Sequence, residues 1–228
     1  MTYCPNRPPT LEDVIQHAVN GIGYARANNR RPRLHPNGFI QLDLAKDASV
    51  RLHVWPAVPL PAQKTRHPIH DHVFDMESTI LCGHLRNVLY KALPLSDAEA
   101  AQAIFRPYRM YRATRIAKDD TVLMPADEKF YAVVESAHED LEPGDTYYMQ
   151  KGLLHDSVPL GLTCTLMYKL DLDVEYRPVV AVPADIKPDN DFRRETFDES
   201  ELWRNIFIAL EIAEAIAKRQ AQERQRAA

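Results

Sequence analysis

Four of the nine histidines in this chain fall within eighteen residues, HPIHDHVFDMESTILCGH, which run from His67 to His84. His70 and His72 are separated by one residue, so on a β-strand both imidazoles point to one face, about 6.5–7 Å apart along the backbone. Two rings placed in this way can share one metal ion, which binds each nitrogen at about 2.0–2.2 Å. Glu77 can add a carboxylate if the strand bends or bulges near residues 73–75, because its offset from His72 is odd. The stretch therefore predicts a metal site, and the competing interpretation is an exposed polar strand rich in histidine.

Another histidine, His155, ends the stretch GDTYYMQKGLLH. Glycine turns at Gly144 and Gly152 bracket a short strand, and His155 comes just after the strand end, where a loop can direct it inwards. We expect His155 to be the third imidazole ligand. The histidines outside this spacing are expected to be solvated or to support the ligands from outside: His53, His67 and His84.

Together, the two stretches resemble the motifs of the cupin superfamily. The first motif, a His-x-His pair followed by Glu and later Gly, reads HDHVFDMESTILCG here. The second motif reads GDTYYMQKGLLH, with Gln150 in the position of the usual proline. The resemblance covers roughly residues 49–173 and implies a jelly-roll β-barrel with a divalent metal held by His70, His72, Glu77 and His155.

The fourth ligand departs from the cupin pattern. Gly83 comes one residue early if Glu77 is the acidic ligand, and counting back from Gly83 places Met76 there instead. Asp75 is a weaker alternative. The first motif is also similar to the thiol dioxygenases, a three-histidine cupin branch with a His and a Tyr on a later strand. This chain offers Tyr168 there without the histidine, so we do not expect a cysteine dioxygenase.

Imidazoles with a carboxylate favour a borderline divalent metal, namely Fe, Mn, Ni, Co or Zn. The resemblance favours Fe(II), and with it a non-haem iron dioxygenase acting on a small polar molecule. Two alternatives stay open. One is a metal-dependent isomerase, lyase or hydrolase, for which Zn or Mn would be suitable. The other is a non-catalytic cupin that binds a small ligand.

The mouth of the barrel is the expected substrate pocket. Tyr148 and Arg112 are the candidate catalytic residues there. The strand residues near the ligands that could line the pocket are Arg86, Asn87, Arg109, Tyr111, Arg112, Tyr147 and Tyr148. Four arginines recur at every third residue of FRPYRMYRATR, and because that spacing alternates faces on a strand, at most two can point into the barrel. Exposed charges on an edge strand are the favoured interpretation of this arginine series.

The remaining pattern predicts a mainly β protein with flanking helices. An arm and a helix are expected over residues 1–38, the helix starting at a Thr10–Asp13 capping pair and loosening at Gly21 and Gly23. Many short alternating strands with turns between them predict a cupin-type jelly-roll barrel over residues 39–180. A short helix at SDAEAAQAIF interrupts them. A linker and an amphipathic helix are expected over residues 181–228.

The composition limits the classes of partner that the protein is expected to bind. The chain has 228 residues and a formal net charge of -4, which does not favour nucleic acid as a partner. We find no run long enough to span a membrane. Three widely spaced cysteines fit a reducing cytoplasm. The expected partner is a small-molecule substrate, and the apolar surface of the last helix could join a second subunit in a homodimer.

Overall fold

The computed structural model describes residues 9–58, 60, 67–102, 104–115, 121–188 and 198–227. The expected N-terminal arm lies outside these residues except for Pro9, and so does Cys4; the side chain of Arg115 is also outside the description. The elements in chain order are α1 (Leu11–Ala27), β1 (Arg33–Leu34), β2 (Ile40–Asp43), β3 (Val50–Trp55), β4 (Phe74–Cys82), β5 (Leu85–Leu95), α2 (Asp97–Gln102), β6 (Tyr108–Arg115), β7 (Thr121–Pro125), β8 (Phe130–Leu141), β9 (Thr146–Met149), β10 (His155–Pro159), β11 (Thr163–Leu172), β12 (Val179–Pro183) and α3 (Glu199–Ala227).

Helix α1 begins as its sequence predicts. The Thr10 side chain accepts from the backbone N–H of Asp13, and the Asp13 carboxylate accepts from the backbone N–H of Thr10, which is a complete capping box. The expectation that Gly21 and Gly23 loosen the helix is wrong, because α1 continues through both to Ala27. A Cβ at position 21 would lie 2.9 Å from the Cβ of Leu44. The glycine therefore allows the helix to pack closely on the segment after β2.

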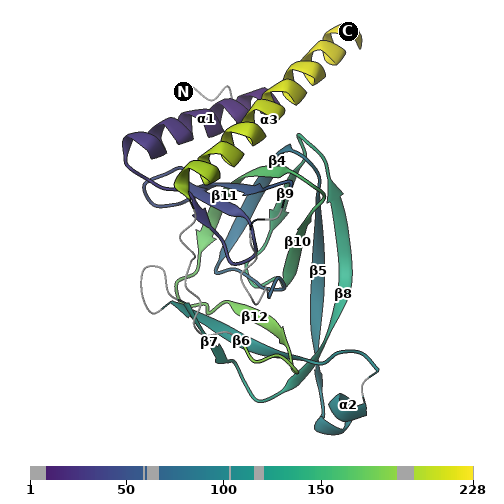
Figure 1. Cartoon of the computed structure of the whole chain (residues 1–228). Helices are drawn as coiled ribbons and strands as arrows, with labels where there is room; N and C mark the ends of the chain where they lie inside the picture. Colours follow the sequence, from purple (N-terminus) through teal and green to yellow (C-terminus); the bar gives the residue numbers. More distant parts are fainter. Residues whose placement is uncertain are drawn as a thin grey trace.

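Two antiparallel sheets form the body of the molecule. In one, which we call sheet A, the strand order is β1-β2-β3-β11-β4-β9; in the other, sheet B, it is β10-β5-β8-β6-β12, with β7 added beside β6. Figure 1 shows α1 and α3 lying across one end of the molecule, over sheet A, while β6, β7 and β12 lie at the opposite end. The mainly β fold class with terminal helices is thus confirmed.

Alternation along the strands of sheet A produces two apolar layers. One face packs against the terminal helices, with Leu52 and Leu166 buried beside Ile206 of α3. The other face looks toward sheet B, where Ile80 and Met167 pack with Leu85 and other core residues. Because side chains alternate, the central strands β3, β4 and β11 contribute to both layers. The face toward sheet B is the one that lines the barrel.

A tight turn at Gly83 joins β4 to β5 and so links the two sheets. Its φ is +79°, and a Cβ there would lie 2.0 Å from the carbonyl oxygen of Leu162. Only glycine fits both the backbone conformation and the space. This is the glycine that closes the first motif in the sequence.

Two strands differ from the sequence-based description, and one short helix agrees with it. His155 is the first residue of β10 rather than a loop residue beyond a strand. Strand β12 lies in a segment expected to be a turn-rich linker and crosses the expected boundary at residue 180. The capping box at Ser96 and Glu99 does start a short helix, α2, as predicted. The division of the chain into three regions otherwise stays a prediction.

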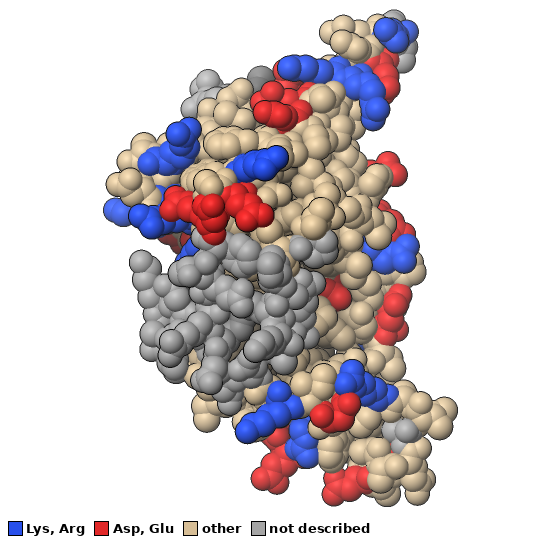
Figure 2. Space-filling view, in the orientation of Figure 1, with Lys and Arg blue, Asp and Glu red and all other residues tan. Residues whose placement is uncertain are grey.

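The surface carries mixed charge. In Figure 2, lysine and arginine side chains are interspersed with aspartate and glutamate over the part of this face that is described. Arg86 pairs with Asp140, and Arg106 pairs with Asp185, each through two hydrogen bonds. None of the helices in the described ranges is long and apolar enough to cross a bilayer.

Candidate metal centre

Three histidines converge where the segment before β4 meets the start of β10. His70 and His72 precede β4, and His155 begins β10. Their ligand nitrogens all lie within 4.8 Å of one another, and their ring centroids are 4.7–5.0 Å apart. Two nitrogens bonded at about 2.1 Å to one tetrahedral ion lie about 3.4 Å apart, so the widest pair has to close by about 1.4 Å, which needs ring movements of somewhat under 1 Å each. The three residues could therefore hold a metal ion.

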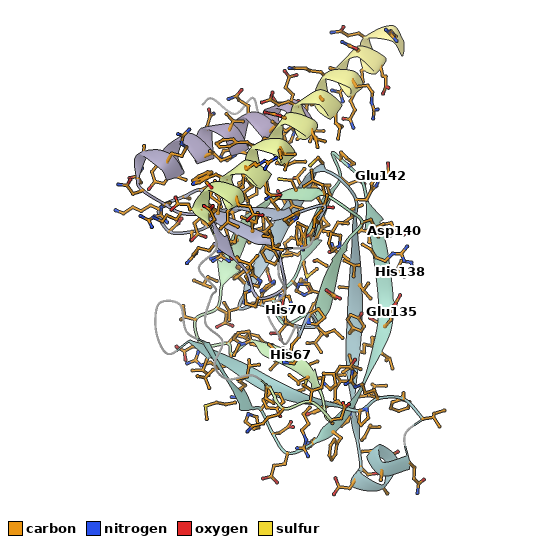
Figure 3. All side chains as sticks on the ribbon, in the orientation of Figure 1. His67, His70, Glu135, His138, Asp140 and Glu142 are labelled. Carbon is orange, nitrogen blue, oxygen red and sulfur yellow. The ribbon has the colours of Figure 1, made fainter. Side chains whose placement is uncertain are left out.

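Backbone hydrogen bonds fix the two ligand segments against each other. His70 N donates to the carbonyl oxygen of His155 at 3.1 Å, and His155 N donates back to His70 O at 2.9 Å. Gly152, with a φ of +77°, donates its N–H to the carbonyl oxygen of His72 at 3.1 Å. The second-motif glycine thus ties the turn before His155 to the strand segment that carries His72. Figure 3 shows His70 in the space between the strands of the barrel and β12.

The ring orientations leave the outer nitrogens available. His70 Nδ1 lies 2.6 Å from the carbonyl oxygen of Pro68, and His155 Nδ1 lies 3.0 Å from that of Leu153. Because a carbonyl oxygen only accepts, both Nδ1 atoms carry the proton. The Nε2 atoms of these two rings are therefore unprotonated and can bind a cation, in the arrangement common for metal-binding histidines.

Burial keeps the three imidazoles neutral. Desolvation lowers the pKa of His70, and it lowers the pKa of His155 to about 3, with a smaller contribution from the charge of His70. The pKa of His72 is well below its ordinary value, first through burial and then through repulsion from the neighbouring imidazoles. Neutral imidazole is the form that binds metal. The site therefore presents its ligands without first losing protons near neutral pH.

The predicted carboxylate ligand does not join this group. Glu77 is exposed, whereas Met76 beside it is 5% exposed and packs with Met149 on the barrel side of the sheet. Asp75 also points outward, accepting hydrogen bonds from Tyr148 Oη and Lys151 N. The register shift beside Phe74 and Asp75 inserts Asp171 into β11 and leaves β4 itself continuous from Phe74, so Glu77 keeps the outward phase. Within the described ranges, the candidate site is made of three histidines alone.

Neither of the two candidate catalytic residues contributes to the histidine group. Tyr148 is 54% exposed and binds Asp75 on the outer face, because its neighbours Tyr147 and Met149 occupy the barrel side of β9. Arg112 is exposed on β6. We therefore leave Tyr148 out of the proposed site, and a role for Arg112 stays a prediction.

A buried carboxylate that the sequence did not single out supports the ligand segment. Asp71, between His70 and His72, is 3% exposed and accepts from Val179 N at 2.6 Å and from the hydroxyl of Tyr176. Burial raises the pKa of Asp71, and these two hydrogen bonds oppose the rise. Both partners lie more than a hundred residues away in the chain, so no local signal marks the contact.

The other histidines and Tyr168 take separate positions. His84 is exposed, and His53 lies inside the barrel against Phe39 and Trp55. The hydroxyl of Tyr168 lies 2.6 Å from Nδ1 of His17 in α1, on the helix side of sheet A. This tyrosine–histidine pair is therefore separated from the barrel interior by the sheet.

Comparisons with known proteins give distant likenesses. Family models do not match the chain, and no curated protein matches it either. Among solved structures, Drosophila melanogaster CENP-C bound to CAL1 is 12% identical, with 69% of this chain and 94% of that chain covered and a TM-score of 0.34. Hydroquinone 1,2-dioxygenase from Sphingomonas sp. TTNP3 is 11% identical, with 58% and 65% covered and a TM-score of 0.31. An oxalate oxidase is 12% identical, with 81% and 73% covered and a TM-score of 0.31. Scores at this level carry no argument about activity.

Proposed function

We propose that this chain is a metal-dependent enzyme with a cupin-type barrel, and that His70, His72 and His155 hold one divalent metal, Fe(II) in the favoured case. The proposed activity is that of a non-haem iron dioxygenase acting on a small polar molecule. The observation that carries the proposal is the convergence of three neutral imidazoles, from two segments far apart in the chain, within 4.8 Å.

The donor set fits such an ion. Imidazole is a suitable ligand for Fe, Ni, Cu and Zn, and three protein ligands leave coordination positions open for other molecules. A divalent ion bound here would supply Lewis-acid polarisation and a fixed point for orienting a substrate. The chain's own contribution is the orientation of the rings by Pro68 and Leu153 and an apolar lining from Phe74, Met76 and Met149.

A second candidate follows from the absence of a carboxylate in the described site. Three histidines with an open fourth position form the donor set of zinc enzymes that activate water. A zinc-dependent hydrolase, lyase or isomerase is therefore the alternative to the dioxygenase, and it would use the same three residues.

The test is reconstitution of tag-free protein with Fe(II) or with Zn²⁺, followed by oxygen-electrode measurements with small phenols, thiols and hydroxy acids as candidate substrates. The dioxygenase proposal predicts oxygen uptake that needs both Fe(II) and a substrate, and that is lost in His155→Ala. Glu77→Gln is the matched control and should keep the uptake. Turnover with Zn²⁺ but without oxygen uptake would support the second candidate instead.

A further inference from the structure

Immediately inside the histidines, the barrel contains a layer of polar side chains. The register places Ser157 of β10 opposite Asn87 of β5, and Ser78 of β4 opposite Tyr147 of β9. These four residues, which we call the interior quartet, come from both sheets. Ser78 is 1% exposed, Asn87 3% and Tyr147 7%. A buried polar layer inside an otherwise apolar barrel needs an explanation.

Strand register sets Ser157 and Asn87 next to the metal centre, and Tyr147, which interacts with both of them and with Ser78, links the rest of the quartet to this pair. His155 pairs with Leu89, and two residues further along the same strands Ser157 pairs with Asn87. Residues two apart on a strand share a face and lie about 6.5–7 Å apart. Beyond the quartet, Ile80, Leu85 and Leu141 close the barrel with apolar side chains. The interior quartet therefore lies between the histidines and the apolar core of the barrel.

The quartet has hydrogen-bonding capacity that the described residues do not use. Ser157 Oγ donates to Asn87 Oδ1 at 2.9 Å, and the Tyr147 side chain interacts with Ser78, Asn87 and Ser157. Asn87 Nδ2 and Ser78 Oγ are nevertheless buried without a partner within hydrogen-bonding distance in the described part of the chain. A buried polar group left without a partner costs about 1–3 kcal/mol. Two such groups in one layer, both on the barrel side, indicate that something else accepts and donates there.

Every member of the quartet is uncharged. Burial raises the pKa of Tyr147, and its polar neighbours Ser78, Asn87 and Ser157 oppose the rise, so the phenol stays protonated at neutral pH. Hydroxyl and amide groups recognise neutral hydrogen-bonding groups, and bringing a full charge into this layer would leave that charge without a counter-ion. Two cations lie near this level in register. Arg51 of β3 is in register with Ser78 across Met167, but its guanidinium is paired with Asp43 at 3.1 Å. Lys169 is in register with Met76 and lies over the Phe74 ring at 5.1 Å.

We propose that the interior quartet is a binding subsite for a neutral hydroxyl or carbonyl group, filled by water in the free protein and by the uncharged polar end of the substrate in the complex. The substrate would then be a neutral molecule that reaches from the metal to Ser78 and Asn87. This inference rests on the proposed function for the position of the metal, but the polar subsite itself can be tested without it.

The first test uses metal-free protein and thermal unfolding. If Ser78 Oγ is hydrogen bonded to water, Ser78→Ala removes that bond and lowers Tm by about 2–4 °C. If the hydroxyl is buried without any partner, the same variant raises Tm, and the proposal is overturned. Asn87→Leu, which has a similar volume, should show the same sign as Ser78→Ala.

The second test uses Zn²⁺-loaded protein and three hydroxamic acids of equal length, whose tails end in hydroxyl, methyl or carboxylate. The hydroxamate group binds the metal in each probe, so differences in affinity among the three probes measure how the interior quartet interacts with the tails. We expect the hydroxyl probe to bind about tenfold more tightly than the methyl probe by calorimetry, and the carboxylate probe to bind most weakly. In Asn87→Leu the advantage of the hydroxyl should disappear, whereas Thr79→Val on the outer face should keep it.

The results separate this inference from the proposed function. Equal binding of the hydroxyl and methyl probes, or preference for the carboxylate, would overturn the neutral subsite while leaving the metal site intact. If the protein bound no metal, the proposed function would fail. The Tm shifts of the metal-free variants would still decide whether the quartet binds water or another polar group.

Discussion

At the residue scale, the barrel interior holds a further histidine that remains neutral because it is buried. Burial lowers the pKa of His53 to about 3, with smaller contributions from the charges of Arg51 and Lys169. His53 Nε2 is buried without a hydrogen-bond partner among the described residues. The ring packs between Phe39 and Trp55 instead. Its role is that of an aromatic core residue that resists protonation.

This position predicts a pH dependence of stability. The pKa of His53 in the folded protein lies below the ordinary value of 6.5. As the pH falls below 6.5, the unfolded chain therefore takes up a proton at His53 before the folded protein does. The free energy of unfolding declines as a result, down to about pH 3. For His53 alone the free energy of unfolding at pH 5 should be about 2 kcal/mol lower than at pH 7. His53→Leu should remove that share in urea titrations of metal-free protein at the two pH values. The exposed His84→Gln is the control, and an unchanged pH dependence in His53→Leu would contradict the burial effect.

A residue of the site can be predicted from the sequence when it belongs to a recognisable motif, and is uncertain when only strand alternation places it. His70, His72 and His155 were found because their spacing repeats a known motif. Glu77 and Tyr148 were misplaced because alternation on a strand gives two possible phases, and only packing shows that Met76 and Met149 occupy the inner one. Tyr147 and Asn87 of the interior quartet are among the pocket-lining residues that the sequence predicts, but the quartet as a set is not, since its members meet only when β4, β5, β9 and β10 are brought together.

At the element scale, the segment that carries His70 and His72 is held on both sides. One side bonds to His155, and the other bonds to β12 through Asp71, which accepts from Val179 N and from Tyr176 Oη. The backbone N–H of Asp71 also donates to Val179 O at 3.1 Å. The spacing of the two imidazoles therefore depends on β12, a strand that the sequence pattern did not reveal.

Asp71→Asn tests this dependence. The asparagine has a similar size but only one acceptor oxygen for the two donors, so the ligand segment should shift. Changes to groups that orient ligands typically weaken metal binding about 10–100-fold, and we expect a loss in this range for Zn²⁺ in competition titrations. Tyr176→Phe, which removes only the hydroxyl, should give a smaller loss. Affinity within about twofold of the wild type in Asp71→Asn would show that the segment is fixed without the carboxylate.

The elements themselves were largely predictable. Strands with clean alternation, such as β3 and β5, and capped helices such as α1 and α2 match their sequence patterns. The short strands β10 and β12 were missed because five residues with proline at the end resemble a turn as much as a strand. Their conformation is set by pairing with β5 and β6.

At the scale of the whole molecule, the terminal helices form a third layer on sheet A. Ile206, Ala209 and Ala213 of α3 are fully buried, and the small residues let α3 approach α1 and the sheet. The same strands that pack under α3 carry Met167 and Ile80 into the barrel. The helix layer therefore supports the wall of the metal site although it lies on the other face.

Ile206→Ala tests that support. Truncating a fully buried isoleucine costs about 2–5 kcal/mol, through lost burial and the cavity left behind. We expect a lower midpoint in urea unfolding, and no change in metal stoichiometry under conditions where the variant stays folded. Ile208→Ala, at a side chain that is 39% exposed, is the matched control and should unfold close to the wild type. Equal stability of the two variants would mean that the helix layer is not part of the cooperative fold.

Part of α3 remains accessible in the single chain. Phe207, Ile208 and Ile212 are 39–40% exposed. Homodimer formation through this helix, like location in the cytoplasm, stays a prediction from the sequence.

The most direct measurement is the metal content of tag-free protein, determined by elemental analysis after incubation with Fe(II) or Zn²⁺ and removal of free ion. We predict about one ion per chain for the wild type and for Glu77→Gln, and loss of most of the bound metal in His72→Ala and in His155→Ala, because two remaining imidazoles leave the ion too few protein ligands. Metal content that is unchanged in His72→Ala, or a folded wild-type protein that retains no metal, would contradict the assignment of these three histidines as a metal centre.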